Sequence, residues 1–157
     1  MQNSRVEGFF HYGIAVRNLE DVTDFFVRVF GLQVVAKREI RANYIEDLVG
    51  SQGVWAEVVM LELGGSGFLE LLRWHEVVQS PASVQGSITS VGAQHLCLFV
   101  NDVDLIVGLL ESFSVVEMIS MGVTQVTEGP NTGARIAFIL VDKILYVELF
   151  ERHKLTN

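Results

Sequence analysis

The chain has 157 residues, 50% of them apolar, and its 11 basic and 19 acidic side chains give a formal net charge of −8. This length suggests one domain or two small modules that share a core, and the apolar content is enough to fill it. The acidic balance excludes a broad nucleic-acid surface, because binding of phosphate backbones depends on clustered Lys and Arg.

The sequence shows no sign of export or of membrane insertion. The first ten residues, MQNSRVEGFF, contain no long apolar segment and no cleavage-like site. No apolar run approaches the roughly 18 residues that span a bilayer. Cys97 is the only cysteine, so an intrachain disulfide is impossible and a reducing compartment fits best. We therefore expect a cytoplasmic globular protein with no nucleic-acid and no membrane partner.

Two ten-residue segments follow one pattern, 84 residues apart. HYGIAVRNLE, which starts at His11, aligns with HLCLFVNDVD, which starts at His95, and Asn18 then aligns with Asp102. Each segment predicts a short strand, a cap and the start of a helix, because Asn and Asp accept hydrogen bonds from the free N–H groups of a first turn. The alignment predicts an internal repeat.

An apolar stripe follows each cap. In residues 22–30, apolar side chains stand at i, i+3, i+4, i+7 and i+8, which predicts an amphipathic helix that stops at Gly31. In residues 103–110 the stripe is similar, although Gly108 weakens the helix somewhat. We expect each helix to cover the large apolar side chains on one face of the neighbouring strand.

Three strand-like runs follow each predicted helix. They are residues 32–37, 55–63 and 67–74 in the first half, and 115–120, 134–141 and 144–150 in the second. A helical turn is expected at 44–49, and the polar segment 77–91 predicts a linker. The fold class is therefore α+β, with two βαβββ modules at about residues 8–76 and 92–152. We expect them to pack as a single domain, since each is too small to bury its own sheet face.

Histidines and glutamates occupy matching places in the two halves. Side chains alternate across a strand, so His11 shares a face with the small residues Gly13 and Ala15. A glutamate stands among apolar residues in the last strand of each half, which is costly unless the carboxylate is paired, protonated or bound to a metal. Nitrogen and oxygen ligands suit Zn, Ni, Co, Mn or Fe(II). The predicted ligands of one divalent ion are His11, Glu70, His95 and Glu148.

The same strand faces carry apolar and aromatic side chains that we expect to line a substrate pocket. These are Phe68, Leu72, Phe99, Tyr146 and Phe150. Arg38, Arg41 and Arg73 either hold a carboxylate or phosphate tail or only keep the surface soluble. Cys97 lies on the ligand face, where we interpret it as a small buried filler and not as a nucleophile.

At these residues the chain resembles the glyoxalase/bleomycin resistance/dioxygenase family, also called the vicinal oxygen chelate superfamily. HYGIAVRNLEDVTDFFVRVFGLQVV is similar to the family's first strand and helix, HLCLFVNDVD to the start of its second module, and FLELL and YVELF to its acid-bearing final strands. The resemblance extends from about Phe9 to Phe150. It implies a cup-shaped mixed sheet around a divalent metal, with the helices on the outside.

The resemblance also implies the metal ligands, since all four predicted ligands fall on the family's metal positions. The order His-Glu-His-Glu is similar to that of bacterial glyoxalase I. The chain departs from the family in one turn, where VDKIL replaces a DPDG-like sequence and leaves Asp142 without a following glycine.

The implied activity is that of a metal-dependent lyase or isomerase similar to lactoylglutathione lyase. A small-molecule substrate with adjacent oxygens would chelate the ion, and a carboxylate would remove a proton next to a carbonyl. We expect Glu148 to be this catalytic base, with Glu70 as the second candidate. A homodimer is expected.

Two other functions remain open. A ring-cleaving dioxygenase of the extradiol type would use Fe(II) with two histidines and one carboxylate. It would need Glu70 to swing away, and His75 is a candidate for its base. A metal-free binding protein of the resistance type would need the cup but not the ligands, so the presence of all four argues against it.

Overall fold

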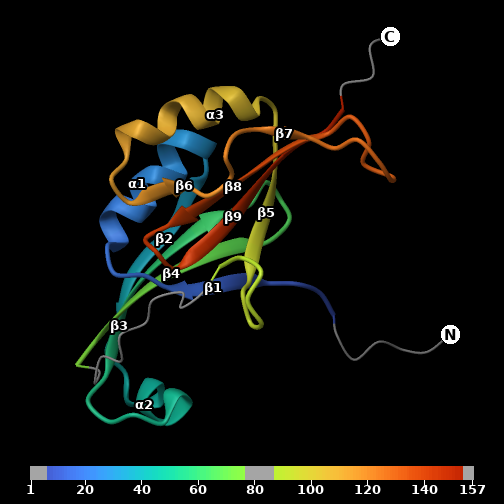
Figure 1. The fold of residues 1–157 in the computed structure, drawn as a ribbon. Helices are drawn as coiled ribbons and strands as arrows, with labels where there is room; N and C mark the ends of the chain where they lie inside the picture. Colours follow the sequence, from blue (N-terminus) through green and yellow to red (C-terminus); the bar gives the residue numbers. More distant parts are fainter. Residues whose placement is uncertain (1–6, 77–86, 154–157) are drawn as a thin grey trace, which may run out of the picture. The chain divides into compact units, whose positions relative to one another are not determined.

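The computed structural model describes residues 7–76 and 87–153 (Figure 1). The predicted elements are present with small shifts at their ends, and a two-residue strand that the sequence did not predict is added. Residues 77–86 of the linker predicted at 77–91 lie outside the described residues. In chain order the elements are β1 (His11–Ala15), α1 (Leu19–Phe30), β2 (Gln33–Ile40), α2 (Asn43–Val49), β3 (Trp55–Glu62), β4 (Phe68–His75), β5 (His95–Val100), α3 (Val103–Leu109), a 3₁₀ turn (Leu110–Ser112), β6 (Val116–Met118), β7 (Thr124–Gln125), β8 (Arg135–Val141) and β9 (Leu145–Glu151).

The strands form two mixed sheets of the same topology. The first has the order β1-β4-β3-β2, and the second has the order β5-β9-β8-β6 with β7 paired to β8. In each sheet the first strand of the module runs parallel to the last strand, and the remaining pairs in this order are antiparallel. The α+β class and the two βαβββ modules predicted from the sequence are confirmed.

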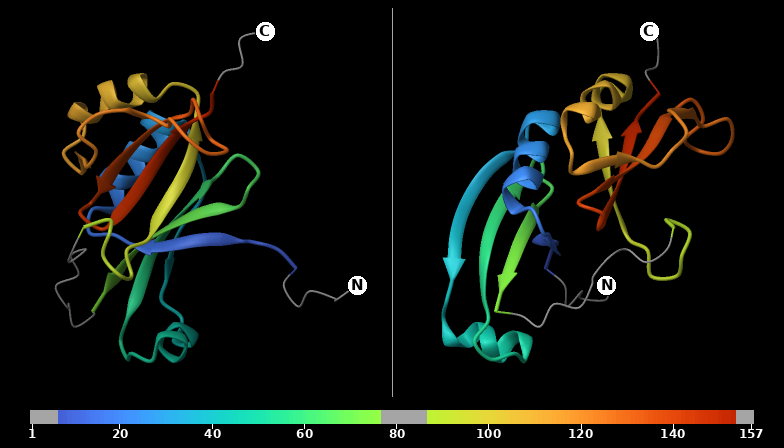
Figure 2. Two further views of the ribbon diagram at one scale, coloured as in Figure 1. Left: turned by 45° about the vertical axis from the view of Figure 1, so that its right-hand side comes forward. Right: turned by 60° about the vertical axis from the view of Figure 1, so that its left-hand side comes forward.

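The chain divides into two compact units that do not follow chain order strictly. The first unit contains the four-stranded sheet and α2, which connects β2 to β3 at one end of that sheet (Figure 2). The second contains α1, the five-stranded sheet and α3. Within it, the ring centroids of Phe25 and Phe113 lie 5.4 Å apart, and the guanidinium of Arg28 lies 5.1 Å from the Phe113 ring. A helix encoded in the first half is therefore packed with the second unit.

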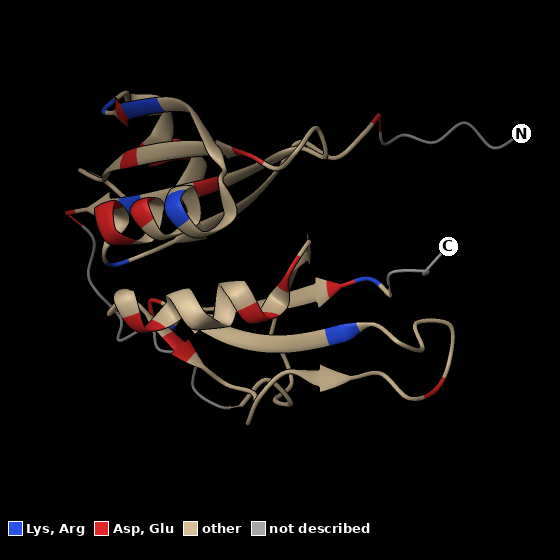
Figure 3. Cartoon of the chain, turned by 90° about the horizontal axis from the view of Figure 1, so that it is seen from above, with Lys and Arg blue, Asp and Glu red and all other residues tan. Residues whose placement is uncertain are grey.

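The helix α1 follows from its sequence pattern. Three apolar residues of the predicted stripe are fully buried, namely Val22, Phe25 and Phe26. Glu20 and Asp21 lie in the first turn and Arg28 in the last, which complements the helix dipole (Figure 3). No helix in the described part of the chain is both long and apolar enough to cross a membrane.

The helix α3 starts at the predicted cap. The Asp102 carboxylate accepts a hydrogen bond of 2.9 Å from the backbone N–H of Leu105. The α-helix ends at Leu109, directly after Gly108, and continues as the 3₁₀ turn. Contacts with β8 and β9 place α3 against the second sheet, so the opposite face of β9 is left for the site described below.

The sequence VDKIL, which departs from the turn sequence of the family that the chain resembles, forms a tight hairpin turn between β8 and β9. Asp142 and Lys143 have φ angles of 51° and 58°, and the N–H of Ile144 donates to the carbonyl of Val141 at 3.0 Å. Asp tolerates the left-handed region better than most side chains, and residues 142–144 complete the reversal between Val141 and its ladder partner Leu145. The turn therefore holds β8 and β9 in register without the glycine that such a turn prefers.

Candidate functional site

In the first unit, β1 and β4 bring a histidine to a glutamate. The parallel register places His11 opposite Phe68 and Gly13 opposite Glu70, so the histidine and the glutamate meet on a diagonal. Nε2 of His11 lies 3.4 Å from Oε2 of Glu70, and the side chains are 35% and 15% exposed. A Cβ atom at Gly13 would approach Oε2 of Glu70 to 3.2 Å, so the glycine keeps the carboxylate accessible.

In the second unit, β5 and β9 repeat this arrangement. His95 lies opposite Tyr146 and Cys97 opposite Glu148, which is the same diagonal offset of two residues. Nε2 of His95 lies 3.2 Å from Oε2 of Glu148, and the side chains are 46% and 16% exposed. The repeat recognised in the sequence therefore extends to strand register and to the distance between the side chains.

Each pair has the chemistry of two ligands of one divalent ion. Donors that lie 2.0–2.2 Å from an ion, at angles between octahedral and tetrahedral, are about 2.8–3.6 Å apart. The observed distances of 3.4 and 3.2 Å match this spacing. Among residues 7–76 and 87–153, no group of three or more His, Cys, Asp or Glu side chains is placed to hold an ion. Within these residues the structure thus shows one His–Glu pair in each unit.

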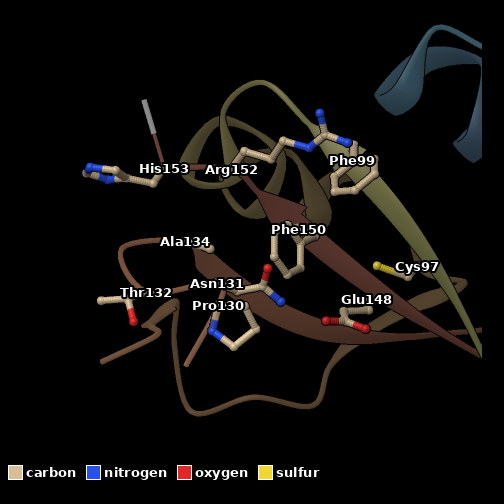
Figure 4. A pocket seen from close by; sticks show the side chains of 10 residues that line it. All are labelled: Cys97, Phe99, Pro130, Asn131, Thr132, Ala134, Glu148, Phe150, Arg152 and His153. Atoms are coloured by element: carbon tan, nitrogen blue, oxygen red, sulfur yellow. The ribbon is translucent and has the colours of Figure 1, made fainter. Parts of the chain in front are cut away.

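A cavity of about 570 Å³ opens within the second unit beside Glu148 (Figure 4). Two of its walls are aromatic, because Phe99 and Phe150 lie edge to face with ring centroids 5.5 Å apart. Side chains of β5, β9, the segment after β9 and the loop before β8 surround it. The lining residues are Cys97, Phe99, Pro130, Asn131, Thr132, Ala134, Glu148, Phe150, Arg152 and His153.

The predicted pocket residues are distributed over both units. Phe99 and Phe150 line the cavity beside Glu148. Tyr146 is only 3% exposed and is not among the lining residues. Phe68 and Leu72 lie in the first unit, half-buried against a core cluster made of Ala56, Val58 and Met60.

Sequence reasoning missed the polar residues of this cavity. Arg152 follows Glu148 and Phe150 at the same period of two, so strand alternation continued past β9 could have found it. Asn131 and Thr132 lie in the loop between β7 and β8, which is closed by backbone hydrogen bonds of 2.8 Å from Val126 to Ala134 and from Gly133 to Val126. No periodic pattern predicts where such a loop lies.

Cys97 is exposed in the structure, so it is not the buried filler expected from the sequence, although its thiol is not activated as a nucleophile. Partial burial of the thiol raises its pKa to about 11, and the charge of Glu148 and a hydrogen bond to Glu148 act in the same direction. A raised pKa disfavours the thiolate, which is the nucleophilic form. Cys97 therefore contributes a small side chain beside Glu148, with the thiol as a hydrogen-bond donor.

His75, the candidate base for oxygen chemistry, lies away from Glu70. Alternation along β4 places the two side chains on opposite faces of the sheet. Nε2 of His75 lies 2.6 Å from Oε2 of Glu57, and its ring stacks on Trp55 at 3.7 Å between centroids. Arg73 donates from Nε to the same Glu57 oxygen at 2.6 Å. His75 is thus engaged in a separate cluster.

Two of the three arginines considered for tail binding also belong to this cluster. Arg73 is paired with Glu57, as described above. The guanidinium of Arg41 lies 3.4 Å from the Trp55 ring centroid, and its Nε donates to Glu39 at 2.7 Å. These contacts stabilise the first sheet on the face opposite Glu70, so they explain both arginines without a substrate.

The chain matches the model of the Glyoxalase/Bleomycin resistance protein/Dioxygenase superfamily over residues 10–139. Its fold is similar to that of a glyoxalase family protein from Bacillus cereus, with a TM-score of 0.81, 18% identity and coverage of 98% of this chain and 99% of that one. The fold is also similar to that of a lactoylglutathione lyase from Agrobacterium tumefaciens, with a TM-score of 0.53, 20% identity and coverage of 94% of this chain and 96% of that one. A third similar structure is the fosfomycin resistance protein FosX from Listeria monocytogenes, complexed with Mn(II) and sulfate. Its TM-score is 0.56, with 13% identity and coverage of 93% of each chain.

No curated protein matches the sequence. The family match covers most of the chain, and the solved structures agree with it in fold. The chain therefore belongs to the glyoxalase/bleomycin resistance protein/dioxygenase superfamily, as its resemblance implied.

The cluster around Glu57 predicts a pH-dependent contribution to stability. Hydrogen bonds from Arg73 and His75 lower the pKa of Glu57 from 4.5 to about 2. A carboxyl whose pKa is lower in the folded state stabilises the fold above its unfolded pKa, and this contribution is lost as the pH falls through the folded pKa. In urea unfolding, the stability difference between the wild type and Glu57→Gln should therefore be largest above pH 5 and should narrow toward pH 3.

The control is Glu111→Gln, which removes an exposed carboxylate outside the cluster. A difference between wild type and Glu57→Gln that stays constant from pH 6 to pH 3 would contradict the assigned pairing.

Proposed function

We propose that this protein is a divalent-metal-dependent lyase or isomerase of the glyoxalase I type, which removes a proton next to a carbonyl of a metal-chelated small molecule. The observation that carries the proposal is the His–Glu pair that recurs at the same register in both units, with Nε2–Oε2 distances of 3.4 and 3.2 Å. Ordinary half-exposed strand positions give no reason for the same two residue types to meet on the same diagonal twice.

One ion would be held by a first-unit pair and a second-unit pair, contributed by one chain or by the two chains of a homodimer. The ligands would be His11, Glu70, His95 and Glu148, and their nitrogen and oxygen atoms suit Zn, Ni, Co, Mn or Fe(II). When bound, the ion supplies Lewis-acid stabilisation of negative charge on the substrate oxygens. The Mn(II) in the FosX complex supports a divalent ion on this fold.

Glu148 is the better placed of the two candidate bases. It lines the cavity, is 16% exposed and receives a hydrogen bond from the Cys97 thiol. A carboxylate at the edge of a substrate cavity can accept a proton from a carbon held beside it. Glu70 has an equivalent place in the first unit and is the second candidate.

The cavity supports a small-molecule substrate. Its volume of about 570 Å³ lies within the roughly 300–1,000 Å³ that ligand pockets span. A molecule with adjacent oxygens would direct them toward His95 and Glu148. The free, exposed thiol of Cys97 is compatible with the reducing cytoplasm expected from the sequence. The homodimer stays a prediction.

Metal binding is the first test. The wild type, purified without a histidine tag, should bind about one divalent ion per chain in equilibrium dialysis with metal analysis. His95→Ala removes a nitrogen ligand and should weaken binding by roughly 100-fold or more, since even residues that only support a ligand are worth 10- to 100-fold.

The matched control is His75→Gln, which removes a histidine on the other sheet face of the first unit. This variant should keep the wild-type affinity. If His95→Ala binds its ion as tightly as the wild type, the ligand assignment is wrong.

Proton exchange is the second test. Glu148→Gln keeps the shape and an oxygen that can bind metal but removes the base. Metal-loaded wild type, incubated in heavy water with hemithioacetals, acyl thioesters and 2-oxo acids, should incorporate deuterium next to the carbonyl of an accepted compound. The variant should retain much of its metal and lose roughly 10²- to 10⁴-fold in exchange rate, which is the usual contribution of a general base.

Exchange that is unchanged in Glu148→Gln would move the base to Glu70 or elsewhere. A parallel incubation of the Fe(II) protein with catechols under oxygen tests the other enzyme class. Ring cleavage there, without exchange in the first series, would replace the lyase or isomerase proposal by the dioxygenase.

A further inference from the structure

The cavity beside Glu148 is also lined by the cationic side chain of Arg152. The guanidinium carbon of Arg152 lies 3.7 Å from the centroid of the Phe99 ring (Figure 4). In the pairing of β5 with β9, Cys97 lies opposite Glu148. Phe99 lies opposite Phe150, which is two residues further along both strands. Because a strand rises about 3.3 Å per residue, this stacked pair lies about 7 Å along the strands from the proposed ligand.

Arg152, like Arg38, has no carboxylate partner among the described residues, and of these two only Arg152 lines the cavity. Four arginines pair with a carboxylate, namely Arg28, Arg41, Arg73 and Arg135. The neighbouring Glu151 is buried and accepts a hydrogen bond from the N–H of Val103, on the α3 side of the sheet. Arg152 is exposed, so its guanidinium donors are available to a ligand in the cavity.

The loop before β8 supplies a second polar group. The side-chain amide of Asn131 lines the cavity and makes no hydrogen bond within residues 7–76 and 87–153. The hydroxyl of Thr132, in contrast, already donates to the carbonyl of Gly129 at 2.6 Å. The cavity therefore offers two polar groups without an internal partner among the described residues, the guanidinium of Arg152, which is stacked on Phe99, and the amide of Asn131.

This arrangement fits an anion in particular. The chain has a net charge of −8, so its overall field repels anions, and an unpaired cation at a cavity is the local exception that would bind one. The planar fork of a guanidinium matches a carboxylate or a phosphate, with two parallel hydrogen bonds. The aromatic walls between the two ends favour a flat apolar group, and about 7 Å is the span of one ring that carries a carboxylate.

We propose, on the basis of the function proposed above, that the substrate is a flat apolar acid of about one aromatic ring. It carries the adjacent, metal-chelating oxygens at one end and an anionic group at the other. Arg152 binds this anionic group, and Phe99 and Phe150 pack against the ring. Arg152 is therefore a specificity-determining residue.

Three probes separate charge from shape. Phenylglyoxylate has the ring and a chelating 2-oxo acid, 4-carboxyphenylglyoxylate adds the distal carboxylate, and 4-carbamoylphenylglyoxylate replaces that carboxylate by a neutral group of similar shape. Their dissociation constants are measured by calorimetry on Co(II)-loaded full-length protein at low ionic strength. We expect the carboxy compound to bind roughly tenfold more tightly than the other two, in the range of a charged hydrogen bond.

Arg152→Gln should reduce this preference to less than about twofold, and Arg152→Lys should retain part of it, because a lysine keeps the charge but not the fork. Arg28→Gln removes an exposed, paired arginine on α1 and should leave the preference unchanged. Equal binding of all three probes to the wild type, or a preference that persists in Arg152→Gln, would overturn the proposal.

The proposed function fails in a different way. If phenylglyoxylate leaves the Co(II) absorption spectrum unchanged, chelation is wrong. The preference for the carboxy over the carbamoyl compound is then measured on metal-free protein by saturation-transfer NMR. A preference that disappears in Arg152→Gln there supports the anion site, and its absence in the wild type overturns it.

Discussion

The candidate site depends on the register of two parallel strand pairs. In β1–β4 and in β5–β9, the ladder sets a histidine and a glutamate two residues apart on one face. A slip of one residue would turn either carboxylate to the other side of its sheet, because side chains alternate. In the second unit the tight turn at Asp142 and Lys143 fixes β9 against β8, with Phe138 opposite Glu148.

The two units share this ligand geometry but differ beside it. Gly13 stands opposite Glu70, whereas Cys97 stands opposite Glu148 and donates a hydrogen bond to it. The second unit in addition carries the aromatic cavity and Arg152. The internal repeat thus accounts for two equivalent His–Glu pairs, and the differences that accumulated around one of them would account for the choice of substrate.

Strand alternation and the repeat made much of the site predictable. They placed His11 with Glu70 and His95 with Glu148, since a period of two assigns a face without knowledge of the partner strand. Alternation assigns a face but not exposure, which is why Tyr146 shares the face of Glu148 and is nevertheless buried.

The sequence pattern does not predict which side chains contact each other across neighbouring strands. His75 pairs with Glu57 because β3 and β4 are neighbours in a register that no motif encodes, and Arg152 folds over Phe99 of a strand some 50 residues away.

The central claim, that both His–Glu pairs bind one ion, is tested most directly by X-ray absorption at the metal edge of the Co(II)-loaded protein. The account predicts two imidazoles and otherwise oxygen ligands. A single imidazole, or a sulfur at about 2.3 Å, would contradict it.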